Sequence, residues 1–128
     1  MKVLVVDDEE DVQLLFQQRF RKEIRSGELN LIFATNGLDA LSVLGKEKQG
    51  IQLVLSDINM PGMSGIDLLR KIKTSPNPPG PDVIMITAYG DEENRFHCKS
   101  LGADELLSKP LDFNVLKELI AERGLSPS

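Results

Sequence analysis

Five short, mainly apolar runs recur along the chain, and a longer stretch with helical spacing of apolar residues follows each of them. The runs cover residues 3–6, 29–34, 52–56, 83–86 and 105–107. In the first and fourth runs the apolar residues are consecutive rather than alternating, which is typical of strands buried on both faces of a parallel sheet. Right-handed crossovers between such strands give a doubly wound α/β sandwich. The sequence therefore predicts one α/β domain with five parallel strands and five helices.

The helices are expected where apolar residues return every three or four positions. They cover residues 11–25, 36–48, a stretch marked by Ile66, Leu69 and Ile72, and residues 112–123. A polar helix is expected at residues 91–101. On the first two helices the predicted core positions are Val12, Leu15, Phe16, Phe20 and Ile24, and then Leu38, Leu41 and Leu44. No internal repeat or interdomain linker interrupts this pattern.

Composition narrows the classes of function. A chain of 128 residues suits one domain that buries its own core, and its single cysteine, Cys98, cannot form an internal disulfide. The net charge is −5, which equals the charge of the acidic run at 7–11 and argues against nucleic-acid binding. The first apolar run is too short for a signal peptide, and no run approaches membrane-spanning length. The sequence predicts a cytoplasmic domain without membrane contact.

Polar side chains stand at the end of four of the predicted strands. Asp7 and Asp8 follow the first strand, Asp57 ends the third, Thr87 follows the fourth and Lys109 follows the fifth. The functional crevice of an open parallel sheet lies beyond the carboxyl ends of its strands. We therefore expect three carboxylates, a hydroxyl and an ammonium group to meet at one edge of the sheet.

Three clustered carboxylates repel one another unless a cation lies between them. A set of oxygen ligands suits Mg²⁺ or Mn²⁺ better than zinc, for which one His and one Cys offer too few ligands. Mg²⁺ usually pairs one or two carboxylates with a phosphate oxygen, and an aspartate can form a covalent acyl phosphate. Asp57 is the best candidate for this nucleophile, because Asp7 and Asp8 are adjacent and better placed to hold a metal. Lys109 and the Thr87 hydroxyl are suited to contact phosphoryl oxygens.

Several motifs occur together and in a fixed order. They are Val5-Val6-Asp7-Asp8-Glu9, residues 55–65 (LSDINMPGMSG), Ile86-Thr87-Ala88, Gly102-Ala103-Asp104 and Lys109-Pro110-Leu111. With these motifs the chain resembles the receiver domain of two-component response regulators from residue 2 to residue 123. The resemblance implies a flavodoxin-like fold with strand order 2-1-3-4-5, a receiver domain at 1–123 and a C-terminal tail at 124–128.

The resemblance also implies roles for the acidic residues. Asp57 is similar to the phosphoacceptor of the family, which receives a phosphoryl group from a phosphohistidine on a sensor histidine kinase or a histidine phosphotransfer protein. Asp7 and Asp8 are similar to the pair that holds Mg²⁺ together with the phosphoacceptor. The backbone carbonyl of Asn59 is similar to a further protein ligand of the metal.

On the other side of the expected site, the resemblance implies a switch. Thr87 is expected to move toward the phosphoryl group, with the backbone amide of Ala88 nearby, and Lys109 is expected to contact the phosphate. The Lys109–Pro110 peptide bond is expected to be cis, a form that costs only ~0.5–1 kcal/mol before proline.

Phosphorylation is then expected to repack the surface made by the helix at 91–101, the strand at 105–107 and the helix at 112–123, where partners of receivers commonly bind. The resemblance leaves open a dimer through this surface. The sequence identifies neither the kinase nor the output domain or effector.

The chain departs from the family at one position of the switch. Many receivers carry Tyr or Phe three residues before the lysine, where this chain has Leu106. Leucine supplies neither the stacking nor the hydroxyl of that aromatic residue. The only tyrosine, Tyr89, lies two residues after Thr87, and we hypothesise that it partly screens the acyl phosphate from water. A surface tyrosine at the start of a loop is an equally good interpretation.

Three classes of function are compared with a strand-end aspartate such as Asp57. A phosphorylation-controlled signalling switch, without turnover of an external substrate, is favoured. A haloacid-dehalogenase-like phosphatase expects a second acidic residue two positions after the nucleophile, where this chain has Asn59. The remaining alternative is a degenerate receiver that binds partners independently of phosphorylation. Such a receiver normally lacks an acidic residue, the phosphoacceptor or the lysine, and this chain has all of them.

Overall fold

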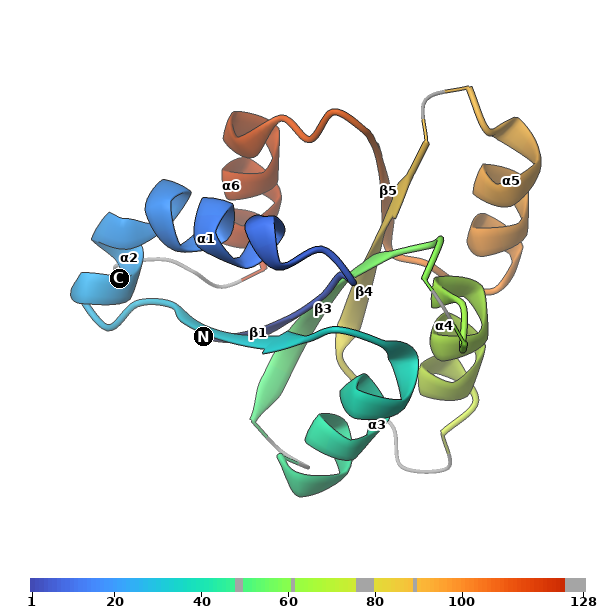
Figure 1. Cartoon of the computed structure of the whole chain (residues 1–128), viewed down its shortest axis with the longest axis horizontal. Coiled ribbons are helices and arrows are strands. Elements are labelled where there is room, and N and C mark those ends of the chain that lie inside the picture. The colour runs from blue at the N-terminus through green and yellow to red at the C-terminus, as the bar shows by residue number, and fades with distance from the viewer. Residues whose placement is uncertain (48–49, 61, 76–79, 89, 124–128) are drawn as a thin grey trace.

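The five apolar runs form the strands of one parallel sheet. In the computed structural model, which describes residues 1–47, 50–60, 62–75, 80–88 and 90–123, the strands all pair in parallel and lie in the order β2-β1-β3-β4-β5 (Figure 1). The strands are β1 (Lys2–Val6), β2 (Asn30–Ala34), β3 (Ile51–Asp57), β4 (Asp82–Thr87) and β5 (Glu105–Ser108). The predicted fold class and strand order are confirmed.

Helices cover both faces of this sheet. In the described part of the chain they are α1 (Glu10–Arg19), α2 (Arg21–Arg25), α3 (Gly37–Lys46), α4 (Gly65–Lys73), α5 (Glu92–Ser100) and α6 (Phe113–Glu122). The apolar side chains of α1, α2 and α6 pack on one face of the sheet, and those of α3, α4 and α5 pack on the other (Figure 1). The α/β sandwich thus has two separate apolar layers, with the sheet between them.

The central strands carry the core. Residues 3–6 of β1 and 53–55 of β3 are at most 2% exposed, whereas the edge strands β2 and β5 are only partly buried. On the α1–α6 face, the rings of Phe16 and Phe20 lie 5.9 Å apart, and the ring of Phe113 packs edge-on against both. Such aromatic packing contributes about 0.5–1.5 kcal/mol for each pair beyond the area that it buries.

The prediction of one helix over 11–25 is wrong in one respect, because two helices occupy this stretch. Phe20 separates α1 from α2 with φ −107° and ψ 19°. Helical hydrogen bonds continue across the break, since the Phe20 N–H donates to the Phe16 carbonyl and the Ile24 N–H donates to the Phe20 carbonyl. The sequence has no Gly or Pro at this point. Phe20 is fully buried against Phe113, so tertiary packing rather than a local helix breaker determines the break.

Two predicted core positions are wrong as well. Leu15 is 39% exposed and Leu38 is 67% exposed. Leu38 lies in the first turn of α3, where the buried residues are Gly37 and Ala40, because small residues allow a helix to approach the sheet closely. The predicted end of this helix at Lys48 lies outside the described residues, as does the expected tail at 124–128.

Candidate functional site

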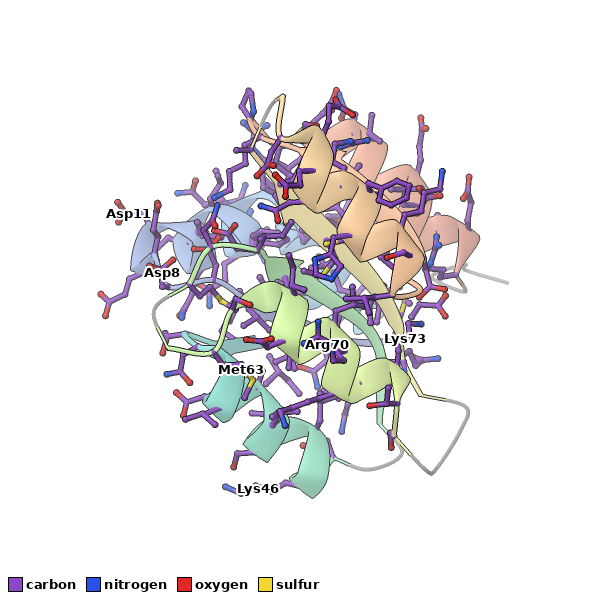
Figure 2. All side chains as sticks on the ribbon, turned by 90° about the vertical axis from the view of Figure 1, so that its right-hand side faces the viewer. Asp8, Asp11, Lys46, Met63, Arg70 and Lys73 are labelled. Atoms are coloured by element: carbon purple, nitrogen blue, oxygen red, sulfur yellow. The ribbon has the colours of Figure 1, made fainter. Side chains whose placement is uncertain are left out.

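The carboxyl ends of β1 and β3 bring three carboxylates together. Val6 at the end of β1 pairs with Ser56 in β3, so the residues that follow them, Asp7 and Asp57, are neighbours. One carboxylate oxygen from each of Asp7, Asp8 and Asp57 lies within 4.8 Å of the other two. Asp7 and Asp57 are buried, whereas Asp8 is exposed and lies at the rim of the molecule (Figure 2). The cluster is therefore open to solvent on one side.

Asp57 is the most constrained carboxylate of the cluster. Its Oδ2 accepts a hydrogen bond from Nζ of Lys109 at 2.8 Å, and its Oδ1 accepts one from the backbone N–H of Asn59 at 3.3 Å. Only 4% of the Asp57 side chain is exposed. Both carboxylate oxygens thus have partners, which hold the carboxylate in one orientation at the carboxyl end of β3.

Burial and charge set the proton affinities at this edge. Loss of water on burial raises the pKa of Asp7. A hydrogen bond of 2.9 Å from the Glu9 backbone N–H opposes this rise, and the negative charge of Asp57 adds to it. Burial alone would lower the pKa of Lys109, but its hydrogen bond with Asp57 and the surrounding acidic charges raise that pKa overall. The ammonium group is therefore held in its charged form.

The ends of β4 and β5 complete the site. The fully buried Thr87 lies one residue beyond Ile86, the β4 partner of Asp57. Its hydroxyl donates to the Ala88 carbonyl at 3.3 Å, and its own carbonyl accepts from the Lys109 N–H at 2.8 Å. The Lys109–Pro110 bond has the cis form that the resemblance implies. These strand ends place the lysine over Asp57.

The roles expected of the other switch residues stay predictions. Leu106 in β5 is half-buried and packs against the core on the α3–α5 face. Tyr89 lies outside the described residues, and the idea that it screens the acyl phosphate stays a hypothesis. The Asn59 carbonyl also stays a predicted ligand, since the contact that the structure gives for Asn59 is the one from its N–H to Asp57.

Gly65 is a site residue to which the sequence assigned no role. A Cβ atom at this position would collide with the backbone carbonyl of Asp57, and the Gly65 N–H donates to the Ile58 carbonyl at 2.8 Å. Ser64 caps α4 by accepting from the Asp67 N–H at 3.2 Å. The signal was a capping serine followed by glycine, with an acidic residue three positions after the cap. The start of α4 thus packs closely against the backbone of Asp57.

The donor set fits a hard divalent cation. The carboxylates offer only oxygen atoms, and the mutual repulsion of Asp7 and Asp57 is a cost that such a cation would offset. Asp7, Asp8 and Asp57 are the residues that would hold it. Mg²⁺ and Mn²⁺ both match this chemistry, as expected from the sequence.

A family model for the response regulator receiver domain matches residues 3–121. The chain belongs to the receiver domain family. It is 34% identical over 119 residues to sporulation initiation phosphotransferase F of Bacillus subtilis, covering 93% of this chain and 90% of that protein. It is 38% identical over 120 residues to transcriptional regulatory protein CpxR of Escherichia coli K12, covering 94% of this chain and 46% of that protein.

Solved receiver structures share the fold. A response regulator receiver domain protein from Clostridium thermocellum superimposes with a TM-score of 0.83 at 29% identity, over 95% of this chain and 92% of that one. Several relatives are longer proteins of which the receiver domain spans about half or less. Within the described residues, no helix has both the length and the apolar character needed to cross a membrane.

Proposed function

We propose that this receiver domain is a phosphorylation-controlled switch in a two-component system. In this proposal Asp57 accepts a phosphoryl group from a phosphohistidine on a sensor histidine kinase or a histidine phosphotransfer protein. The observation that carries the proposal is the position of the Asp57 carboxylate between two acidic side chains, Asp7 and Asp8, and the ammonium group of Lys109. A nucleophile with this environment attracts a divalent cation and a phosphoryl group together.

The transfer requires one bond to form and one to break. A carboxylate oxygen of Asp57 attacks the phosphorus atom, a P–O bond forms, the P–N bond to the imidazole breaks, and the imidazole keeps the electron pair. The Asn59 N–H keeps the carboxylate oriented during this step. Lys109 exchanges its contact with Asp57 for one with a phosphoryl oxygen, and its charge offsets the added negative charge.

Mg²⁺, when bound by the acidic cluster, supplies charge neutralisation at the phosphoryl oxygens. The acidic pair Asp7 and Asp8, with Asp57 and the Asn59 carbonyl, would hold it. Water later hydrolyses the acyl phosphate and resets Asp57, so the domain is a phosphoacceptor and not an enzyme that turns over an external substrate. The phosphorylation-independent alternative is not favoured, because Asp7, Asp8, Asp57 and Lys109 are all present and adjacent.

The new charge would act through the buried Thr87 hydroxyl. A phosphoryl group adds roughly −1.5 to −2 charge by analogy with phosphorylated hydroxyls, and it offers acceptors stronger than the Ala88 carbonyl that Thr87 now uses. Movement of Thr87 would repack the α5–β5–α6 surface, where Leu106 replaces the usual aromatic residue. An output domain, an effector or a second receiver would bind this surface in the cytoplasm. Direct nucleic-acid binding by the domain is not part of the proposal.

The deciding experiment is incubation with acetyl phosphate and Mg²⁺, followed by intact mass measurement. The wild type is expected to gain the mass of one phosphoryl group, and hydroxylamine is expected to remove it. Asp57→Asn is expected to remain unmodified, whereas Asp67→Asn, an exposed aspartate of α4, is a matched control that should react like the wild type. A wild type that stays unmodified over a range of Mg²⁺ concentrations and pH would contradict the proposal.

A further inference from the structure

The strand β2 forms one open edge of the sheet. It pairs only with β1 in the described sheet. The Asn30 N–H donates to the Met1 carbonyl at 2.8 Å, and the Ala34 carbonyl accepts from the Asp7 N–H at 3.1 Å, so both groups point to the side of β1. Backbone groups alternate in direction along a strand. The N–H and carbonyl groups of Leu31 and Phe33 therefore point away from β1. Among the described residues, no backbone group pairs with this outer side.

This edge lacks the usual protection against strand addition. Natural edge strands carry charges, prolines or bulges that prevent another strand from pairing with them. The strand β2 reads Asn-Leu-Ile-Phe-Ala, with neither charge nor proline, and its pairing with β1 is regular throughout. An uncharged edge with free hydrogen-bonding groups can accept a further strand.

A groove lies beside this edge and is lined by residues of β2, α1 and α2. Its volume is about 300 Å³. The lining residues are Gln17, Arg21, Ile24, Arg25, Asn30, Leu31 and Phe33. Ile24, Leu31 and Phe33 are half-buried and form an apolar floor, and two exposed arginines of α2 stand above it. The groove thus continues the apolar face of the edge strand.

The two arginines give the groove its charge. Arg21 and Arg25 are four residues apart, so they lie on one side of α2. Neither forms an ion pair with any described residue, and no acidic residue lines the groove. Two unpaired guanidinium groups beside an apolar floor complement an acidic ligand. This charge is opposite to the net charge of −5 of the chain as a whole.

We propose that the groove between α2 and β2 binds an extended acidic segment of a partner protein, which adds to β2 as a sixth strand. The outward backbone groups of Leu31 and Phe33 bond to the backbone of the segment. On the face of the segment that turns toward α2, apolar side chains pack on the groove floor and carboxylates pair with Arg21 and Arg25. The site is a protein-interaction surface beyond the proposed phosphorylation switch.

A second copy of this chain is a poor occupant of the same edge. Two β2 strands related by a two-fold axis perpendicular to the sheet would pair antiparallel and place both α2 helices on the same face. Arg21 and Arg25 of each copy would then approach those of the other, and like charges oppose such an interface. Charge complementarity therefore selects an acidic partner rather than a homodimer.

The test uses a fluorescein-labelled peptide of nine residues, measured by fluorescence anisotropy. Every second residue of the peptide is valine or glutamate in turn, so that both types share one face of a strand, and the residues between them are threonine. Two versions of the peptide carry N-methyl groups on alternate amides, one version for each set of amides. Only one set faces β2 in an added strand, so one version is expected to lose binding by about tenfold or more while the other loses much less. A peptide with lysine in place of glutamate is expected not to bind.

The matching protein variant is Arg21→Gln with Arg25→Gln, both at exposed positions. It is expected to bind the peptide about tenfold more weakly, to unfold at the wild-type temperature and to react with acetyl phosphate like the wild type. Lys71→Gln with Lys99→Gln removes two exposed cations elsewhere and should bind like the wild type. The unchanged phosphorylation separates this site from the proposed switch.

Amide NMR of the ¹⁵N-labelled protein locates the site. The Leu31 and Phe33 resonances are expected to shift on addition of the peptide. The proposal is overturned by absence of binding, or by equal effects of the two methylated peptides on affinity. It is also overturned if the Arg21→Gln/Arg25→Gln variant binds the peptide as tightly as the wild type. A dimer of the free protein that pairs through β2 would also overturn the assignment of an acidic partner.

Discussion

The ammonium Nζ of Lys109 lies 2.8 Å from Oδ2 of Asp57, and this contact joins the end of β5 to the end of β3. The two side chains differ in their access to water, since 43% of the lysine side chain is exposed but only 4% of the aspartate. A buried carboxylate depends on its partners for the hydration that it has lost. Because Lys109 is exposed, it can move to a phosphoryl oxygen at small cost. Asp57 is buried, so its carboxylate needs another partner once Lys109 has moved.

Lys109→Met is expected to lower the free energy of unfolding of the metal-free protein by about 1–2 kcal/mol at neutral pH, because it leaves a buried carboxylate without its cation. The solvent exposure of the lysine keeps the loss below that of a fully buried pair. Urea unfolding measures the effect. Adding Asp57→Asn to this variant is expected to restore most of the loss, and Lys71→Met serves as a control for an exposed lysine. Equal stability of Lys109→Met and the wild type would contradict the prediction.

Asp7→Asn is expected to stabilise the metal-free protein by about 1 kcal/mol at pH 7. The pKa of Asp7 is raised in the folded state, so the folded protein holds this proton more tightly than the unfolded chain does. Stability is therefore lost as pH rises from the ordinary pKa of 3.8 to the folded pKa, and the whole loss is present above it. The variant lacks this loss.

Urea unfolding in EDTA at several pH values tests the prediction for Asp7. The difference between Asp7→Asn and the wild type is expected to be near zero below pH 3.8, to grow as pH rises, and then to stay constant. A wild type that is the more stable protein at pH 7 without metal would show that hydrogen bonding by the charged carboxylate outweighs its burial.

Mg²⁺ is expected to raise the unfolding temperature of the wild type in a concentration-dependent way. A ligand that binds only the folded state stabilises it by about 2.7 kcal/mol at one hundred times its dissociation constant. Asp8→Asn should lose most of this stabilisation. Asp11→Asn removes an equal charge from the same acidic run but outside the cluster of carboxylates, and should keep it. Equal losses in both variants would indicate diffuse screening instead of a bound ion.

The sequence predicted the sheet well because its central strands are buried on both faces. A strand that is buried on both faces needs consecutive apolar residues, as β1 and β4 have, and few other secondary structures show this pattern over so short a run. Helix faces were predicted less well. Leu38 and Ala40 are both apolar, and the rotation of α3 against the sheet decides which of them is buried. That rotation depends on partners far along the chain.

In the candidate site, too, some contacts were predictable from the sequence and others were not. The meeting of Asp7, Asp57 and Lys109 follows from parallel strands, since all their carboxyl ends lie at one edge. The contact of the Asn59 N–H with Asp57 and the close approach of Gly65 depend on the path of the loop between β3 and α4. The capping pattern at Ser64 marks the start of α4 but does not specify the path of the loop before it, so these contacts required the structure.

Gly65→Ala is expected to lower the free energy of unfolding by about 1–3 kcal/mol, because the added methyl group would overlap the backbone carbonyl of Asp57 and the chain must shift to admit it. The shift moves Asp57, the proposed nucleophile. Phosphorylation by acetyl phosphate is therefore expected to slow by about tenfold or more, since small displacements of reacting groups have large effects on rate.

Gly45→Ala is the matched control, because Gly45 lies in α3 with open space around its Cβ position. Alanine in a helix interior is favoured over glycine by roughly 0.5–1 kcal/mol, so this variant is expected to be more stable and to react at the wild-type rate. Urea unfolding and intact mass over time measure both effects. If Gly65→Ala is destabilised but reacts at the wild-type rate, the shift is absorbed by α4, and Asp57 is positioned by Lys109 and Asn59 alone.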